Sequence, residues 1–206
     1  MKAFLEKERL IPFLEALRRQ IEVIAPIATE AGAVYSTWQG QPLDLGSNPL
    51  FPPTEFLLPH KETLFRYIQE SGRYTFKEDN IPPRLLFAIR PCDLRAIALL
   101  DRIFGSEPSD QAYFRRRRAT SLVVLNCTNR GDECFCSCLG AGPEAQDPCD
   151  LQLTDIGDGY LCQAETPAGV LILKSAFNLL QPAQLEHNRE KARRLQLVRD
   201  AMPRDR

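Results

Sequence analysis

The sequence lacks an excess of charge of either sign, and it lacks any long apolar run. Its 206 residues carry 26 Lys and Arg against 27 Asp and Glu, a formal net charge of −1. This balance gives no reason to expect nucleic acid or an anionic membrane surface as a partner. No apolar run approaches the roughly 20 residues of a membrane-spanning helix. The charged first eight residues also lack the apolar core of a signal peptide, so we expect a cytoplasmic protein.

Recognisable catalytic motifs are also absent from the sequence. No side chains form a nucleophile–base arrangement, and Asp101 and Glu107 do not form an acid–base pair. The segment Gly140-Ala141-Gly142 lacks the strand–turn–helix context of a dinucleotide-binding fingerprint. We therefore expect no catalytic residues in this chain.

The length suggests one domain with an appendage. We expect an α/β domain over residues 1–178 and a charged linker or docking helix over residues 179–206. The pattern predicts helices over 5–22, from Lys61, over 92–104, over 110–117 and from Gln184, and strands over 23–26, 33–35, 84–89, 122–126, 151–156, 160–164 and 169–173, with a polar connector over 74–83.

Two of these strands are continuous apolar runs separated by a helix. Residues 84–89 and 122–126 are short enough to be strands buried on both faces. Strand–helix–strand of this kind predicts a βαβ unit. The predicted fold is thus a small parallel or mixed sheet with flanking helices, β-hairpins towards the C-terminus and a charged C-terminal helix.

Cysteine is the residue that the sequence concentrates. Four of the seven cysteines lie between Cys127 and Cys138, directly after the second apolar strand, and Cys92 follows the first. Clustered cysteines in a reducing compartment indicate metal or redox chemistry rather than disulfides. The carboxyl ends of neighbouring parallel strands share one edge of a sheet, so the two groups can converge there.

Four thiolates suit an iron–sulfur cluster or Zn²⁺. The spacing matches neither a bacterial ferredoxin run nor a zinc ribbon; it favours iron–sulfur over zinc, and zinc over no metal. Cys138 is either a bystander or a replacement ligand, because three alternate cysteines cannot easily face one centre. We expect Cys149 and Cys162 to be structural.

Other polar residues have two interpretations each. Arg90 could neutralise the charge of a cluster or form a surface salt bridge. The run Arg115–Arg118 could dock an acidic partner or be a solvated helix end, and we favour the solvated end. His60 is expected to be a surface or capping residue.

Three segments resemble the electron-transfer (beta) subunits of sulfhydrogenases and the A subunit of anaerobic sulfite reductase. They are residues 87–104, which contain Arg90-Pro91-Cys92-Asp93, the stretch from Leu125 to Pro143, and residues 153–161. The resemblance covers most of residues 1–175. More distantly, the chain is similar to the beta subunits of deazaflavin-reducing hydrogenases, which use a cluster beside a flavin.

The resemblance implies a [4Fe-4S] cluster held by Cys92, Cys127, Cys134 and Cys136, with a flavin nearby as an open alternative. It also implies a subunit that passes electrons between a donor module and a catalytic subunit of a redox complex. Members of this family continue into a ferredoxin-like domain. We therefore expect either a piece of a longer protein or a short member that takes a ferredoxin-like protein as partner. The remaining alternative is a structural zinc-binding or assembly module.

Overall fold

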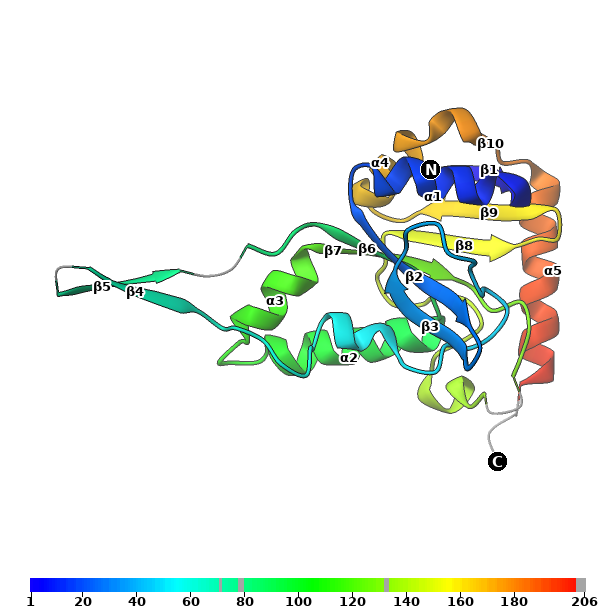
Figure 1. Ribbon diagram of the computed structural model, residues 1–206. Coiled ribbons are helices and arrows are strands. Elements are labelled where there is room, and N and C mark those ends of the chain that lie inside the picture. Colours follow the sequence, from blue (N-terminus) through cyan, green and yellow to red (C-terminus); the bar gives the residue numbers. More distant parts are fainter. Residues whose placement is uncertain (71, 78–79, 132–133, 203–206) are drawn as a thin grey trace.

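A mixed eight-stranded sheet forms the body of the molecule (Figure 1). The structure is a computed structural model that describes residues 1–70, 72–77, 80–131 and 134–202. The strand order is β10-β1-β9-β8-β7-β6-β2-β3. The strands are β1 (Lys2–Glu6), β2 (Glu22–Thr29), β3 (Gly32–Thr37), β6 (Arg84–Ile89), β7 (Thr120–Leu125), β8 (Leu151–Asp155), β9 (Gly159–Ala164) and β10 (Gln181–Pro182).

The centre of this sheet is parallel and both of its flanks are antiparallel. Strands β2, β6, β7 and β8 all run the same way, while β3 pairs antiparallel with β2 on one side. On the other side β9, β1 and β10 pair antiparallel in turn. The expected α/β fold with a βαβ unit is therefore confirmed, and β6 and β7 are its two parallel strands.

Helices cover both faces of the sheet, which is why β6 and β7 are apolar throughout. They are α1 (Leu10–Arg18), α2 (Pro91–Gly105), α3 (Gln111–Arg118), α4 (Pro167–Ser175) and α5 (Leu185–Ala201). One face packs against α1 and α4 through Phe13, Leu14 and Leu173. The other packs against α2 and α3 through Leu94 and Tyr113.

Helix α5 lies along the outer part of the sheet, beside β8 and β9 (Figure 1). Its buried residues are Lys191, Leu195 and Val198. Phe4 of β1 stacks on His187 with the ring centroids 4.2 Å apart. The charged C-terminal helix is thus confirmed, and it packs on the body of the molecule. None of the helices in the described ranges is long and apolar enough to cross a membrane.

Two of the helices predicted in the first half of the chain differ from the structure. The helix expected from Leu5 starts only at Leu10, because residues 2–6 form strand β1 between β9 and β10. The helix expected from Lys61 is wrong, because its residues lead into a hairpin of β4 (Arg66–Glu70) and β5 (Arg73–Lys77). The connector expected over 74–83 is wrong for residues 74–77, which lie in β5; residues 80–83 form no helix or strand, and residues 78–79 lie outside the described ranges. Aromatic residues at every second position stabilise strand pairing, and no core is present there for a helix to cover.

The strand expected over 169–173 is also wrong, because it is helix α4. The Thr166 hydroxyl caps this helix by accepting a hydrogen bond from the Gly169 backbone N–H at 3.2 Å. Pro167 occupies the first turn, where its missing N–H costs nothing. The cap and the proline outweigh the strand preference of the apolar run that follows them.

Candidate metal centre

The structure brings the four cysteines expected as ligands to one edge of the sheet. Cys92 lies in the first turn of α2, directly after β6, and Cys127 follows β7 by two residues. Cys134 lies further along the same loop, and Cys136 begins the short 3₁₀ helix η3 (Cys136–Leu139). Strands β6 and β7 are parallel neighbours, so their carboxyl ends meet there.

Electrostatic coupling shows that these thiols share one neighbourhood. The pKa of Cys92 is raised to about 12, mainly by burial and also by Asp93, Cys127 and Cys136. Cys92 is exposed by surface area, yet enough protein surrounds its thiol for burial to be the largest cause. Burial likewise raises the pKa of Cys127 to about 11, with contributions from Cys136 and Cys134. Neighbouring thiols therefore disfavour a bare negative charge on Cys92 and on Cys127.

A β-bulge lies near the end of β6, just before the cysteine edge. The register with β7 shifts between Phe87 and Ile89, and Ala88 between them has a φ of +59°. The Tyr35 hydroxyl donates a hydrogen bond to the Ala88 carbonyl at 3.2 Å. Phe87 and Ala88 both pack in the core under α1, and Ile89 packs in the core under α2. The bulge thus breaks the strand alternation just before Arg90, as bulges near functional sites often do.

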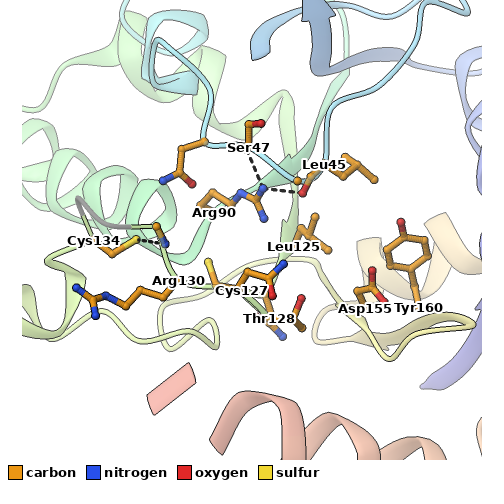
Figure 2. Close-up of a pocket in the computed structure, with 15 residues that line it drawn as sticks. Leu45, Ser47, Arg90, Leu125, Cys127, Thr128, Arg130, Cys134, Asp155 and Tyr160 are labelled. Carbon is orange, nitrogen blue, oxygen red and sulfur yellow. Dashed lines mark hydrogen bonds between the residues drawn. The ribbon is translucent and has the colours of Figure 1, made fainter. Parts of the chain in front are cut away.

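Arg90 is buried next to the cysteines, with 8% of its surface exposed. Its Nη2 donates to the carbonyls of Leu45 at 2.7 Å and Ser47 at 2.9 Å (Figure 2). No carboxylate among the described residues forms an ion pair with its guanidinium, so the surface salt bridge is not found there. Its positive charge instead lowers the pKa of Cys127. A buried cation of this kind suits a site that accumulates negative charge.

Backbone groups shape the loop that carries Cys134 and Cys136. The Gly131 N–H donates to the Cys134 sulfur at 3.3 Å, a contact typical of metal-bound thiolates. Gly140 ends η3 with a φ of +65°, which glycine adopts without steric cost. The Ala141 N–H then donates to the Cys136 carbonyl at 3.0 Å. The chain therefore turns back sharply after the cysteines.

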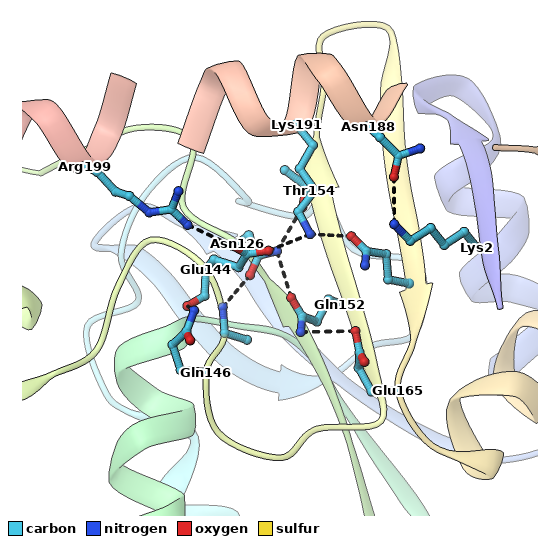
Figure 3. Close-up of polar contacts among 12 residues, drawn as sticks. Lys2, Asn126, Glu144, Gln146, Gln152, Thr154, Glu165, Asn188, Lys191 and Arg199 are labelled. Carbon is cyan, nitrogen blue, oxygen red and sulfur yellow. Dashed lines mark hydrogen bonds and ion pairs between the residues drawn. The ribbon is translucent and has the colours of Figure 1, made fainter. Parts of the chain in front are cut away.

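A buried asparagine joins the two ends of this loop. The Cys127 N–H donates to the Pro143 carbonyl at 2.7 Å. The Asn126 side chain accepts from the Ala145 N–H at 2.9 Å and donates to the Thr154 hydroxyl at 2.9 Å (Figure 3). Our sequence analysis missed this role. The only signal was a fully polar residue at the end of an otherwise apolar strand.

Glu144, which follows Pro143, connects the cysteine loop to α5. The Glu144 carboxylate forms ion pairs with Lys191 at 2.7 Å and with Arg199 at 2.8 Å (Figure 3). Arg130, from the same loop, donates to the Ala201 carbonyl at the end of α5 at 2.8 Å. The C-terminal helix therefore holds the cysteine loop at both of its ends.

A polar cavity of about 310 Å³ adjoins the cysteines (Figure 2). Cys127 and Cys134 lie on one side of it, and Arg90, Ser47 and Tyr160 are also in its wall. The size falls within the range of small-molecule sites.

The remaining cysteines lie apart from this edge or at its margin. Cys149 and Cys162 are buried in the two opposite cores of the sheet. Cys138 is exposed on η3. His60 is exposed.

The arginine run on α3 differs from the solvated helix end that we favoured. Arg116 is buried, where it pairs with Glu62 and donates to the Leu57 carbonyl at 2.6 Å. Arg117 pairs with Asp101 at 3.1 Å. At least these two arginines serve the packing of the domain itself.

The cysteines are not grouped as the ligands of a single metal ion. Within the described ranges, no three His, Cys, Asp or Glu side chains are grouped so that they could hold one metal ion. Zinc requires four ligands at about 2.0–2.3 Å from one point. Four thiols that share a neighbourhood, a backbone N–H aimed at sulfur and a buried guanidinium are features that suit an iron–sulfur cluster.

This site defines a cysteine-bearing α/β domain with cysteines at the ends of two parallel strands. The chain is 30% identical to the sulfhydrogenase 2 subunit beta of Pyrococcus furiosus over 120 residues. The match covers 58% of this chain and 34% of that protein, so the chain spans about a third of the length of this relative. The chain thus resembles sulfhydrogenase beta subunits. No family model matches it, and no solved structure does.

Proposed function

We propose that this chain is an iron–sulfur electron-transfer subunit, or a domain of one, within a redox complex of the hydrogenase or sulfite reductase type. Cys92, Cys127, Cys134 and Cys136 would hold a [4Fe-4S] cluster. The observation that supports the proposal is that β6 and β7 end at one edge of the sheet beside these cysteines, where the other thiols contribute to the raised pKa values of Cys92 and Cys127. The similarity to a sulfhydrogenase beta subunit supports the same reading.

The residues around the four cysteines would stabilise the charge of the cluster and fix the loop that binds it. A bound cluster supplies one-electron transfer. Arg90 offsets negative charge at the site from a buried position, and the Gly131 N–H donates to the Cys134 sulfur. The Asn126 and Glu144 contacts hold the loop in one conformation. Fixed donors and a fixed loop keep structural rearrangement small when charge changes.

Partners and location follow from the proposed role. The donor module and the catalytic subunit would be other chains of the complex, and a ferredoxin-like protein would supply further clusters. A flavin beside the site stays a prediction, as does a cytoplasmic location. A yellow chromophore released on denaturation would identify the flavin.

Anaerobic purification tests the proposal directly. We expect about four iron and four sulfide per chain, broad visible absorption that is lost on oxidation, and a paramagnetic signal on reduction. Cys127→Ser should lose most of this iron, because one of four ligands is removed. Cys162→Ala is the matched control, since that thiol is buried in the core away from the site.

Three results would contradict the proposal. Equal iron in both variants would reject the ligand assignment. A colourless protein that binds zinc would identify the structural zinc module instead. A protein without metal after anaerobic reconstitution would leave only an assembly role.

A further inference from the structure

The β4–β5 hairpin projects away from the body of the molecule (Figure 1). Its two strands form a separate sheet and pair with each other alone among the described strands. Tyr67 lies opposite Phe76 in the register, and Gln69 lies opposite Tyr74. The hairpin is therefore a two-stranded ribbon without a supporting layer, an arrangement that is at best marginally stable in water.

The two faces of this ribbon differ sharply in chemistry. Side chains alternate along a strand, so Phe65, Tyr67, Gln69, Tyr74 and Phe76 share one face. Phe65 lies against Phe76 with ring centroids 5.6 Å apart, and Tyr67 lies 6.0 Å from Tyr74. We call this the aromatic face. The opposite face carries Arg66, Ile68, Glu70, Arg73, Thr75 and Lys77.

The aromatic face exposes more apolar surface than is usual for a soluble monomeric protein. Its four rings are between 55% and 67% exposed. Aromatic side chains bury ~150–250 Å² each when covered, so these rings offer about 500 Å² of apolar surface. Apolar patches of this size on a soluble protein usually mark a binding site.

We propose that the β4–β5 ribbon inserts into a groove on a different polypeptide, with an apolar floor for the aromatic face and acidic groups on the opposing wall. A stable interface buries about 800 Å² on each partner, which exceeds what the aromatic face provides. The remainder must come from the ribbon's edges and from its other face, where three cations accompany one anion. A groove can enclose all of these surfaces, whereas the same ribbon in a second copy covers only one face.

This inference rests on the proposed function in one respect: it takes the polypeptide to be another subunit of the redox complex. The ribbon is the element that would attach the cluster domain to that subunit. Its place outside the main sheet lets it enter a partner without disturbing the strands that carry the cysteines.

Photocrosslinking in the cell that encodes the chain tests the proposal. The probe is p-benzoylphenylalanine in place of Tyr67 in a tagged full-length chain, with the same probe at Leu171 as the control. Leu171 is 67% exposed on α4, as Phe76 is on the ribbon. We expect an adduct from position 67 with one polypeptide that also co-purifies in equal amount, and none from position 171. The crosslinked peptide should lie in an apolar groove flanked by Asp or Glu.

Variants of the aromatic face complete the test. In the full-length tagged chain, Tyr67→Ser with Phe76→Ser should reduce co-purification of that polypeptide at least tenfold, and Leu171→Ser should not change it. An adduct of twice the chain mass would indicate a second copy and would overturn the proposal. Equal adducts from positions 67 and 171, or none from either, would also overturn it. Iron content is measured on the same samples, so that loss of the partner with iron retained is separated from failure of the proposed function.

Discussion

At the scale of single residues, Cys162 and Cys127 have raised pKa values for different reasons. Burial alone raises the pKa of Cys162 from its ordinary 9.0 to about 12, and no charged neighbour contributes. Cys127 is affected by burial and also by Arg90 and two other thiols. Charged groups therefore act on Cys127 from several sides, and none acts on Cys162.

The ionisation of Cys162 gives a test by pH. Its folded pKa lies above the unfolded value, so its neutral form stabilises the fold fully below pH 9 and loses this effect as the pH rises towards about 12. Between these values the unfolding free energy should fall by about 1.4 kcal/mol per pH unit on account of this group. Cys162→Ala removes that slope. Urea unfolding in reductant at pH 9 and pH 10.5 measures it, and identical slopes in both proteins would refute the assignment.

At the scale of elements, α5 acts on the cysteine loop through Glu144. Lys191 is almost fully covered, with its side chain 11% exposed, and Glu144 is 25% exposed. Lys191 also donates to the Gln163 side chain of β9. The Lys191 ammonium of α5 therefore connects the helix to Gln163 of the sheet and to Glu144 of the loop (Figure 3).

Glu144→Gln should weaken this connection measurably. The substitution leaves a nearly buried ammonium without its carboxylate, so we expect a loss of about 1–3 kcal/mol in unfolding free energy. Glu15→Gln is the matched control, because Glu15 pairs with Arg18 on the exposed side of α1 and should cost less than about 0.5 kcal/mol. Chemical denaturation compares them. Equal losses would show that Glu144 contributes no more than a surface pair.

At the scale of the whole molecule, the ribbon and the body are separable. The eight-stranded sheet is continuous without β4 and β5, and the ribbon's aromatic face packs on no core cluster among the described residues. Replacing residues 65–77 by a short Gly-Ser linker should therefore change the unfolding free energy by no more than about 1 kcal/mol. Thermal and urea unfolding measure the change. A loss of several kcal/mol would mean that the ribbon supports the domain.

The sequence predicted the parallel centre of the fold, with Cys92 and Cys127 after its two strands. Residues 85–89 and 122–125 are apolar throughout, and such runs depend little on their surroundings. The ribbon and α4 were not predicted. Short segments of this kind fit either a helix or a strand, and contacts with the rest of the chain determine which one forms. Three further features depend on residues far apart along the chain: the Ala88 bulge, the Asn126 contacts and the Glu144 ion pairs. Local sequence patterns therefore did not predict them.

The position of β1 has a consequence for the order of events during synthesis. Ala3 pairs with Cys162 and with Pro182, so the pairings of β1 among the described strands are with segments synthesised much later along the chain. At about 5–20 residues per second, β1 waits roughly 10–30 s on the ribosome for these neighbours. The parallel centre can assemble meanwhile, since β2, β6, β7 and β8 are complete by Asp155. Nascent chains that end before β9 should thus carry a protease-sensitive β1 segment beside an already folded parallel centre.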